Sequence, residues 1–211
     1  MKLIFLVSGN GGNLKFIDKC IKLKLLKDID LSVIADRECG ALKYARENNI
    51  LNFKVKYKKT YTNELSKALN EINPDYIVTN IHKIIDELTV NKYNGKMINL
   101  HYSLLPSFGG EIGVKPIEKA FEKKCMFIGS TLHYINEEVD AGEIIAQATI
   151  PNNFDKAYMI NKVFRSGCLN LLNFFLSYNN KEITEYNDIY FNPKLSVDVM
   201  QLTEEFWESI K

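Results

Sequence analysis

Apolar and polar positions alternate in two different patterns along this chain of 211 residues. Four compact apolar runs in the first half predict buried strands, at 3–7, 31–35, 53–55 and 75–78. Between these runs, apolar residues recur every three or four positions and predict helices, at 14–26, 41–48 and 62–72. Such regular alternation of strand and helix is typical of a parallel sheet that helices cover on both faces.

The second half of the chain continues this alternation and then changes it. A short helix at 88–93 precedes a strand that begins at Ile98, and further helices are predicted at 116–121 and 157–175. Two further apolar segments predict strands, at 128–134 and 143–150. Because these two strands are joined by a turn at Asp140-Ala141-Gly142, we expect them to pair antiparallel and the sheet to become mixed.

The predicted fold class is therefore α/β. We expect a single Rossmann-like domain with a mostly parallel central sheet of about seven strands that becomes mixed, and with helices on both faces. Residues 1–181 would form this domain. Residues 182–211, which end in a small helix around Phe206 and Trp207, would form a C-terminal tail packed on the same domain.

Composition narrows the classes of partner and compartment. The formal net charge is +1, and only three of the 27 basic residues are arginine, so we expect no nucleic acid partner. The four cysteines are widely spaced and predict reduced side chains in a cytoplasmic protein, with no disulfide frame and no metal site. The longest early apolar run has five residues and predicts a strand, not a signal or a membrane anchor.

Candidate chemistry begins on the strand that contains Asn99 and His101. Side chains two apart on a strand point to the same face, so an amide donor and an imidazole lie side by side. Acyl transfer needs such a pair, since one group can hold a developing oxyanion while the other moves a proton. Asp140, about forty residues later, could orient the imidazole. Taken alone, an N-x-H step more often just ends a strand.

Three motifs that follow one another along the chain favour a catalytic role over a simple strand end. They are INLHYSLLPSF from Ile98, GSTLHYINEEVDAG from Gly129, and the strand IIAQATI from Ile144. Together they resemble the folate-dependent formyltransferase family, from the first residue to about Ile150. The resemblance implies a one-carbon transferase whose catalytic residues are Asn99, His101 and Asp140. It implies 10-formyltetrahydrofolate as co-substrate and no metal.

The same resemblance implies further contacts. Folate would lie against five residues: Lys83, Ile84, Ile85, Asn136 and Val139. Lys83 stands where the family commonly has arginine, and the two isoleucines are as well explained by core packing. Four more side chains could touch the acceptor or support the site, although each has an ordinary structural explanation: His82, Ser103, Phe108 and His133.

The segment SGNGGN between the first strand and the first helix is a candidate anion site. It lacks the third glycine of the dinucleotide fingerprint and the GK[ST] of a P-loop, and alone it is as well explained as a tight turn. It resembles the phosphate loop of the glycinamide ribonucleotide branch of the family. In that resemblance Gly11, Gly12 and Asn13 contact the phosphate of the acceptor, with Gly12 in place of a serine.

Several departures from that branch keep the acceptor open. Tyr102 replaces a common proline, the loop 107–115 differs, and Gly167 stands about where a glutamate contacts the substrate amine. These features resemble sugar-nucleotide N-formyltransferases instead. We expect an N-formyltransferase acting on a phosphate-bearing amine, first of all glycinamide ribonucleotide in purine biosynthesis. A nucleotide-linked amino sugar and a non-catalytic folate- or nucleotide-binding module remain alternatives, and the protein would be a monomer or homodimer.

Overall fold

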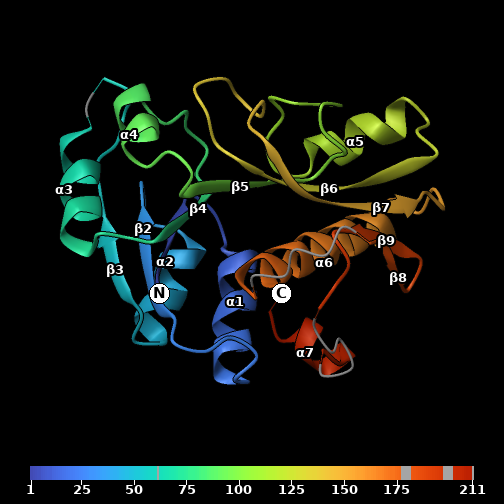
Figure 1. Ribbon diagram of the computed structural model, residues 1–211, viewed down its shortest axis with the longest axis horizontal. Helices are drawn as coiled ribbons and strands as arrows, with labels where there is room; N and C mark the ends of the chain where they lie inside the picture. Colours follow the sequence, from blue (N-terminus) through green and yellow to red (C-terminus); the bar gives the residue numbers. More distant parts are fainter. Residues whose placement is uncertain (61, 177–181, 197–201, 211) are drawn as a thin grey trace. The chain divides into compact units, whose positions relative to one another are not determined.

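Figure 1 shows the computed structural model of the chain, which describes residues 1–60, 62–176, 182–196 and 202–210. In chain order its elements are β1 (Lys2–Val7), α1 (Gly12–Lys22), β2 (Asp30–Ala35), α2 (Gly40–Glu47), β3 (Leu51–Lys54), α3 (Asn63–Ile72), β4 (Tyr76–Asn80), α4 (Glu87–Lys92), β5 (Met97–His101), α5 (Lys115–Glu122), β6 (Phe127–Tyr134), β7 (Ile144–Pro151), α6 (Lys156–Phe175), β8 (Thr184–Tyr186), β9 (Ile189–Asn192) and α7 (Glu204–Glu208).

Within the described residues the strands form a nine-stranded sheet in the order β3-β2-β1-β4-β5-β6-β7-β9-β8. Strands β1 to β4 pair in parallel, whereas β6, β7, β9 and β8 pair antiparallel. The predicted α/β fold with a mostly parallel sheet that becomes mixed is confirmed, with two strands more than the expected seven. The chain divides into two compact units, Met1–Ile98 with Asp198–Lys211, and Asn99–Val197.

The first unit is built on β1, whose residues Leu3–Val7 are almost completely buried. The chain runs from β1 outward to β2 and β3 and then returns, so that β4 pairs with the other edge of β1. In open α/β sheets such a change of direction opens a crevice at the carboxyl ends of the strands, where ligands bind. The loops that follow β1, β2 and β4 meet at the carboxyl ends of these strands, where Ser8 contacts Asp36 and the amide of His82.

Helix α7 belongs to the first unit and packs on α1. The indole of Trp207 stacks on the ring of Phe16 with centroids 5.3 Å apart, and Phe206 meets the same ring edge-on at 5.7 Å. All three aromatic side chains are buried. The predicted small helix at the end of the tail is therefore present, while 197–201 and 211 of that tail lie outside the described residues.

The second unit places α6 along β6 and β7 (Figure 1). Two glycines permit close packing here. A Cβ on Gly129 would lie 1.9 Å from the carbonyl oxygen of Ala148 on β7, and one on Gly167 would lie 2.6 Å from Cδ2 of Leu100. Buried hydroxyls of Ser130 and Ser166, 2.8 Å apart, join β6 to α6.

Three sequence expectations differ from the structure. Helix α1 ends at Lys22, four residues before the predicted end, because Lys24 adopts a left-handed conformation with φ of 61°. Helix α3 begins at Asn63, one residue later than predicted; Thr62 is its N-cap, and its side chain makes no capping hydrogen bond. Segment 182–196 contains the hairpin β8–β9, whose short strands carry too few residues for a period-two pattern to stand out.

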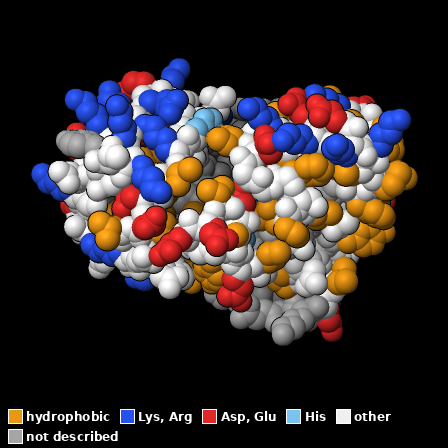
Figure 2. All heavy atoms as spheres, turned by 90° about the horizontal axis from the view of Figure 1, so that it is seen from above, with side chains coloured by type: hydrophobic (Ala, Val, Ile, Leu, Met, Phe, Trp, Pro, Cys, Tyr) orange, Lys and Arg blue, Asp and Glu red, His pale blue; other side chains and the backbone are white. Residues whose placement is uncertain are grey.

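The described surface carries charges of both signs. Figure 2 shows basic and acidic side chains on the face it displays, with hydrophobic side chains exposed among them. None of the helices in the described ranges has both the length and the apolarity that crossing a membrane requires.

Gly129→Ala tests the close approach of β6 and β7. The added methyl meets a backbone carbonyl, which cannot rotate away, so we expect a loss of about 1–3 kcal/mol in the free energy of unfolding. Urea denaturation would measure it. Gly9→Ala is the matched control, because no atom lies within 4 Å of a Cβ built there. Equal stability of the two variants would contradict the packing described.

Candidate active site

Strand β5 presents Asn99 and His101 on one face, as their spacing predicts. His101 is 5% exposed, and Asn99 is half-buried between the buried residues Ile98 and Leu100. The strand ends at His101, and the loop that follows folds back over the ring. Regular strand backbone therefore precedes both side chains, and an irregular loop follows His101.

Both nitrogens of His101 have partners. Nδ1 lies 2.9 Å from Oγ of Ser103, and that hydroxyl donates its hydrogen to the carbonyl of Ser107. Since a hydroxyl has one hydrogen, Ser103 accepts from Nδ1, and this nitrogen carries a proton. Nε2 lies 3.2 Å from the carbonyl oxygen of Glu111 and 3.3 Å from Oδ2 of Asp140. The predicted supporting role of Ser103 corresponds to this contact.

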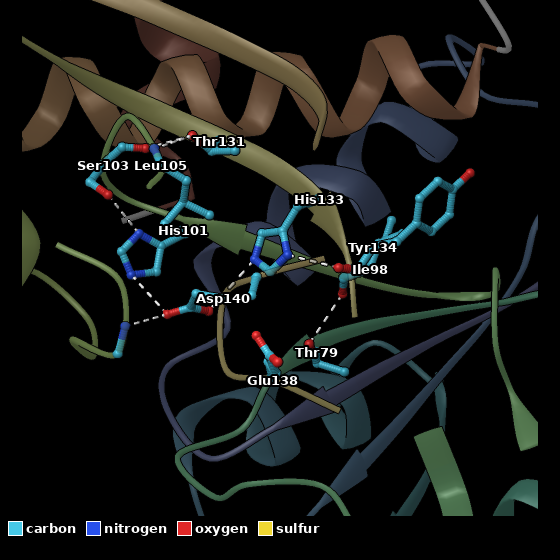
Figure 3. Close-up of polar contacts among 12 residues, drawn as sticks. Thr79, Ile98, His101, Ser103, Leu105, Thr131, His133, Tyr134, Glu138 and Asp140 are labelled. Atoms are coloured by element: carbon cyan, nitrogen blue, oxygen red, sulfur yellow. Dashed lines mark hydrogen bonds and ion pairs between the residues drawn. The ribbon is translucent and has the colours of Figure 1, made fainter. Parts of the chain in front are cut away.

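Asp140 lies in the turn between β6 and β7, in the left-handed conformation with φ of 54°. Figure 3 shows its carboxylate between the rings of His101 and His133. Oδ2 also accepts a hydrogen bond of 2.8 Å from the amide of Gly110, and Oδ1 lies 3.6 Å from Nε2 of His133. The structure thus brings together three predicted residues from two separate motifs: His101, His133 and Asp140.

Burial and charge act in opposite directions on this cluster. Burial lowers the pKa of His101, while the Asp140 carboxylate and the Glu111 carbonyl favour its protonated form. Burial of Asp140 opposes its ionisation, but the contacts with His133 and with the Gly110 amide outweigh it, so the pKa of Asp140 is lowered. Asp140 is therefore a carboxylate at neutral pH.

The loops around the cluster are braced by side chains that sequence reasoning missed. Oγ1 of Thr131 donates to the carbonyl of Ser103 at 2.7 Å and accepts from the amide of Leu105 at 3.0 Å. Gln147 donates to the same hydroxyl at 3.1 Å. Threonine and glutamine on a strand resemble ordinary surface residues in sequence, so no local signal marks them.

The other predicted residues of the second unit lie in the same loops. Asn136 is exposed and braces the Asp140 turn, donating to the carbonyl of Ala141 at 3.3 Å and accepting from the amide of Glu138 at 3.1 Å. Val139 is 55% exposed and Phe108 is half-buried with φ of 59°. Val139 is thus open to a ligand, and Asn136 shapes the turn that holds the carboxylate.

In the first unit the glycine loop leads directly into α1. Gly11 is the N-cap, with φ of 72°, and a Cβ there would lie 2.6 Å from Cβ of Ala41, so only glycine fits. Gly12 and Asn13 form the first turn, and the Asn13 side chain is buried. The first N–H groups of a helix lack partners within it, so this turn offers backbone donors to an anion.

Asp36, at the carboxyl end of β2, forms an ion cluster that the sequence analysis did not single out. Its carboxylate, 0% exposed, accepts from Oγ of Ser8 at 2.7 Å and faces Arg37 at 2.8 Å and Lys83 at 2.9 Å. Burial opposes its ionisation, but Arg37, Lys83 and Ser8 together hold the pKa of Asp36 far below its usual value. The Ser8 hydroxyl in turn accepts from the amide of His82 at 2.9 Å.

Lys83 and its neighbours have different environments. The Lys83 ammonium also donates to the carbonyl of Tyr57 at 2.6 Å, so a direct folate contact would require this cluster to open. His82 is exposed. Ile84 is 58% exposed and Ile85 9%, so Ile84 is open to a ligand whereas Ile85 packs in the core. No group of three or more His, Cys, Asp or Glu side chains in the described part of the chain is arranged to hold a metal ion.

Comparison with known proteins decides the family. The model of the family described as Formyl transferase matches residues 1–159. The chain belongs to the formyl transferase family. The resemblance drawn from the three motifs is thereby confirmed, and the matched region contains the glycine loop, the Asn99–His101 strand and the Asp140 turn.

Individual members of the formyl transferase family are similar over much of the chain. A chloroplastic phosphoribosylglycinamide formyltransferase of Arabidopsis thaliana is 33% identical over 159 residues, covering 71% of this chain and 54% of that protein. A formyltetrahydrofolate deformylase of Haemophilus influenzae is 38% identical over 104 residues, covering 49% of this chain and 36% of that protein. The chain thus spans about half or less of these curated relatives.

A solved structure of a family member extends the likeness beyond the matched region. Phosphoribosylglycinamide formyltransferase from Anaplasma phagocytophilum has a TM-score of 0.74 and 25% identity, covering 94% of this chain and 95% of its own. The corresponding protein from Coxiella burnetii has a TM-score of 0.75 and 25% identity, covering 93% and 96%. The shared fold therefore extends beyond residue 159, where the match to the family model ends.

Asp36→Asn tests the ion cluster by linkage. The pKa of Asp36 is depressed in the folded state, so its stabilisation is present above the unfolded value of about 3.9 and disappears as pH falls below it. We expect the variant to lose about 2 kcal/mol of unfolding free energy at pH 7. The difference from wild type should shrink steadily between about pH 4 and pH 2. A difference that stays constant over that range, in urea denaturation, would contradict the ionised cluster.

Proposed function

We propose that this chain transfers a formyl group from 10-formyltetrahydrofolate to the primary amine of a small phosphate-bearing acceptor, with glycinamide ribonucleotide as the first candidate. The observation that carries the proposal is the contact between His101 and Asp140, 3.3 Å apart, beside Asn99 on the same strand face. The names of the similar proteins support the same chemistry. Monomeric or homodimeric assembly and a cytoplasmic location stay predictions.

The proposed reaction is a direct attack of the amine on the formyl carbon. The amine lone pair forms the new C–N bond, and the bond from the formyl carbon to the folate nitrogen breaks, its electron pair leaving with that nitrogen. Asn99 would donate a hydrogen bond to the oxyanion that develops between these two events. An Nε2–H of His101, facing Asp140, would stabilise the same oxygen. Asp140 would take the proton that the amine loses, and this proton would pass to the folate nitrogen as that nitrogen leaves.

The glycine loop supports a phosphate on the acceptor. Its left-handed Gly11 is the N-cap of the 11-residue helix α1, which begins a few residues after the carboxyl end of β1. Backbone N–H groups and the helix dipole favour a phosphate there. Gly12 offers no hydroxyl, so the backbone and Asn13 would supply the contacts.

In the second unit, folate recognition would rest on the exposed side chain of Val139 and on the backbone of the Asn136 turn. In the first unit the exposed side chain of Ile84 is the predicted folate contact that is open to a ligand. Lys83 would contribute by holding the segment after β4 in place through Asp36, and Ile85 by packing beneath it. A flat, partly apolar ring system requires such walls together with a few fixed polar groups.

Two departures that favour a sugar acceptor can be weighed by their contacts. Gly110 supplies the amide that holds Asp140, so it belongs to the catalytic loop whichever acceptor binds. Gly167 packs on Leu100, which leaves no room for a glutamate unless Leu100 moves. Amine recognition would then depend on Asn99 and Asp140, which keeps a nucleotide-linked amino sugar as the second candidate. Water is a third acceptor, since similar proteins carry the name formyltetrahydrofolate deformylase.

Asn99→Ala and His101→Ala test the catalytic assignment. Loss of one oxyanion donor should lower kcat by about 100- to 1000-fold, without loss of the fold. Formation of deformylated folate and of formyl product would be measured with glycinamide ribonucleotide, with a dTDP- or UDP-linked amino sugar, and with no acceptor. Asn94→Ala is the matched control, because Asn94 is exposed in the turn before β5.

The acceptors separate the candidates. Product from glycinamide ribonucleotide that inorganic phosphate inhibits would support the first candidate, and product from the sugar nucleotide the second. Formate released without any amine would indicate hydrolysis. Near-wild-type turnover of Asn99→Ala and His101→Ala would rule out the assigned roles, and a protein that binds folate but transfers formyl to none of these acceptors would favour a binding module.

A further inference from the structure

His133 is the second imidazole beside Asp140, in addition to His101. Its side chain comes from β6 and is only 1% exposed. Nδ1 lies 2.8 Å from the carbonyl oxygen of Tyr134. A carbonyl oxygen only accepts, so Nδ1 carries a hydrogen, and the other nitrogen, Nε2, is turned toward Asp140 (Figure 3).

Nε2 of His133 is buried and, among the described residues, has no hydrogen-bond partner. The nearest opposing group is Oδ1 of Asp140, 3.6 Å away, which is too long for a good hydrogen bond and short enough for an ion pair. A neutral ring would turn a bare lone pair toward a carboxylate, with no donor among the described residues to compensate it. A protonated ring would face its counter-charge instead. The geometry therefore favours the imidazolium.

The two oxygens of Asp140 are divided between the two rings. Oδ2 takes the Gly110 amide at 2.8 Å and faces Nε2 of His101 at 3.3 Å. Oδ1 faces His133. The left-handed turn at Asp140 fixes the backbone from which the carboxylate projects, so each ring meets a different oxygen.

We propose that His133 is a positioning residue for Asp140: its imidazolium, anchored on the Tyr134 carbonyl, holds Oδ1 and leaves Oδ2 for His101 and the acceptor amine. This inference rests on the proposed function for its catalytic consequence. The charge state of His133 in the resting protein is independent of that function, and the two are tested separately.

The protonation of His133 can be measured directly, because the chain has three histidines. In 15N-histidine-labelled protein, long-range 1H–15N correlation spectra distinguish protonated from bare ring nitrogens, and His82→Gln and His101→Gln assign the signals. We expect both nitrogens of His133 to be protonated at pH 7 in the wild type, and Nε2 to lose its proton in Asp140→Asn. A bare Nε2 in wild-type protein would overturn the proposal.

Two variants separate a positioning role from simple packing. The amide of His133→Asn can reach the Tyr134 carbonyl but not Asp140, whereas the amide of His133→Gln can donate toward Oδ1. We expect kcat to fall at least about tenfold in His133→Asn, with KM for the folate changed less than about twofold, and His133→Gln to recover part of the loss.

Which of His133→Asn and His133→Gln has the lower kcat distinguishes a positioning role from a purely structural one. A purely structural histidine would make His133→Asn the milder change, since it keeps the Tyr134 contact, and that order would overturn the proposal. Thermal unfolding shows whether each variant folds, and if one does not, the nitrogen spectra of wild type and Asp140→Asn still decide. Absence of formyl transfer in the wild type would count against the proposed function alone, because the spectra do not depend on turnover.

Discussion

The candidate site depends on one partly buried carboxylate whose charge has to be balanced from several sides. Asp140 is drawn into the second unit by a left-handed turn and meets the Gly110 amide and two imidazoles there. A carboxylate out of water is tolerated only with such partners. The braces at Thr131 and Asn136 can be understood as a means of keeping the surrounding loops in place around this charge.

Much of the fold follows from the sequence, because long apolar runs and amphipathic stretches report burial directly. Strand β1 and helix α6 are examples, predicted within a few residues of their bounds. The predicted end of α1 was wrong, because the helix stops before Lys24, whose left-handed backbone conformation cannot be predicted from the spacing of apolar residues. The hairpin β8–β9 was not predicted either, because strands of three and four residues carry too little pattern.

Site residues that belong to ordered sequence motifs could be predicted. Residues whose role depends on contacts between distant segments could not. Asn99, His101 and Asp140 stand out through spacing and family resemblance. Asp36 is different: it is one acidic residue after one strand, and only the approach of Ser8 and Lys83 from two other loops gives it a role. The contact of the Gly110 amide with Asp140 could not be predicted from the sequence either, because almost every residue type provides a backbone N–H.

The stacking of Trp207 on Phe16 has a consequence for how this protein is made. The contact joins residues near the two ends of the chain, within one compact unit. During synthesis Phe16 emerges early and lacks its contacts with Phe206 and Trp207 until residues 204–208 have left the ribosome. Contacts between distant segments form slowly, and exposed apolar surface invites aggregation. Completion of the first unit therefore waits for residues 204–208, and a chain truncated before them would lack this contact with Phe16.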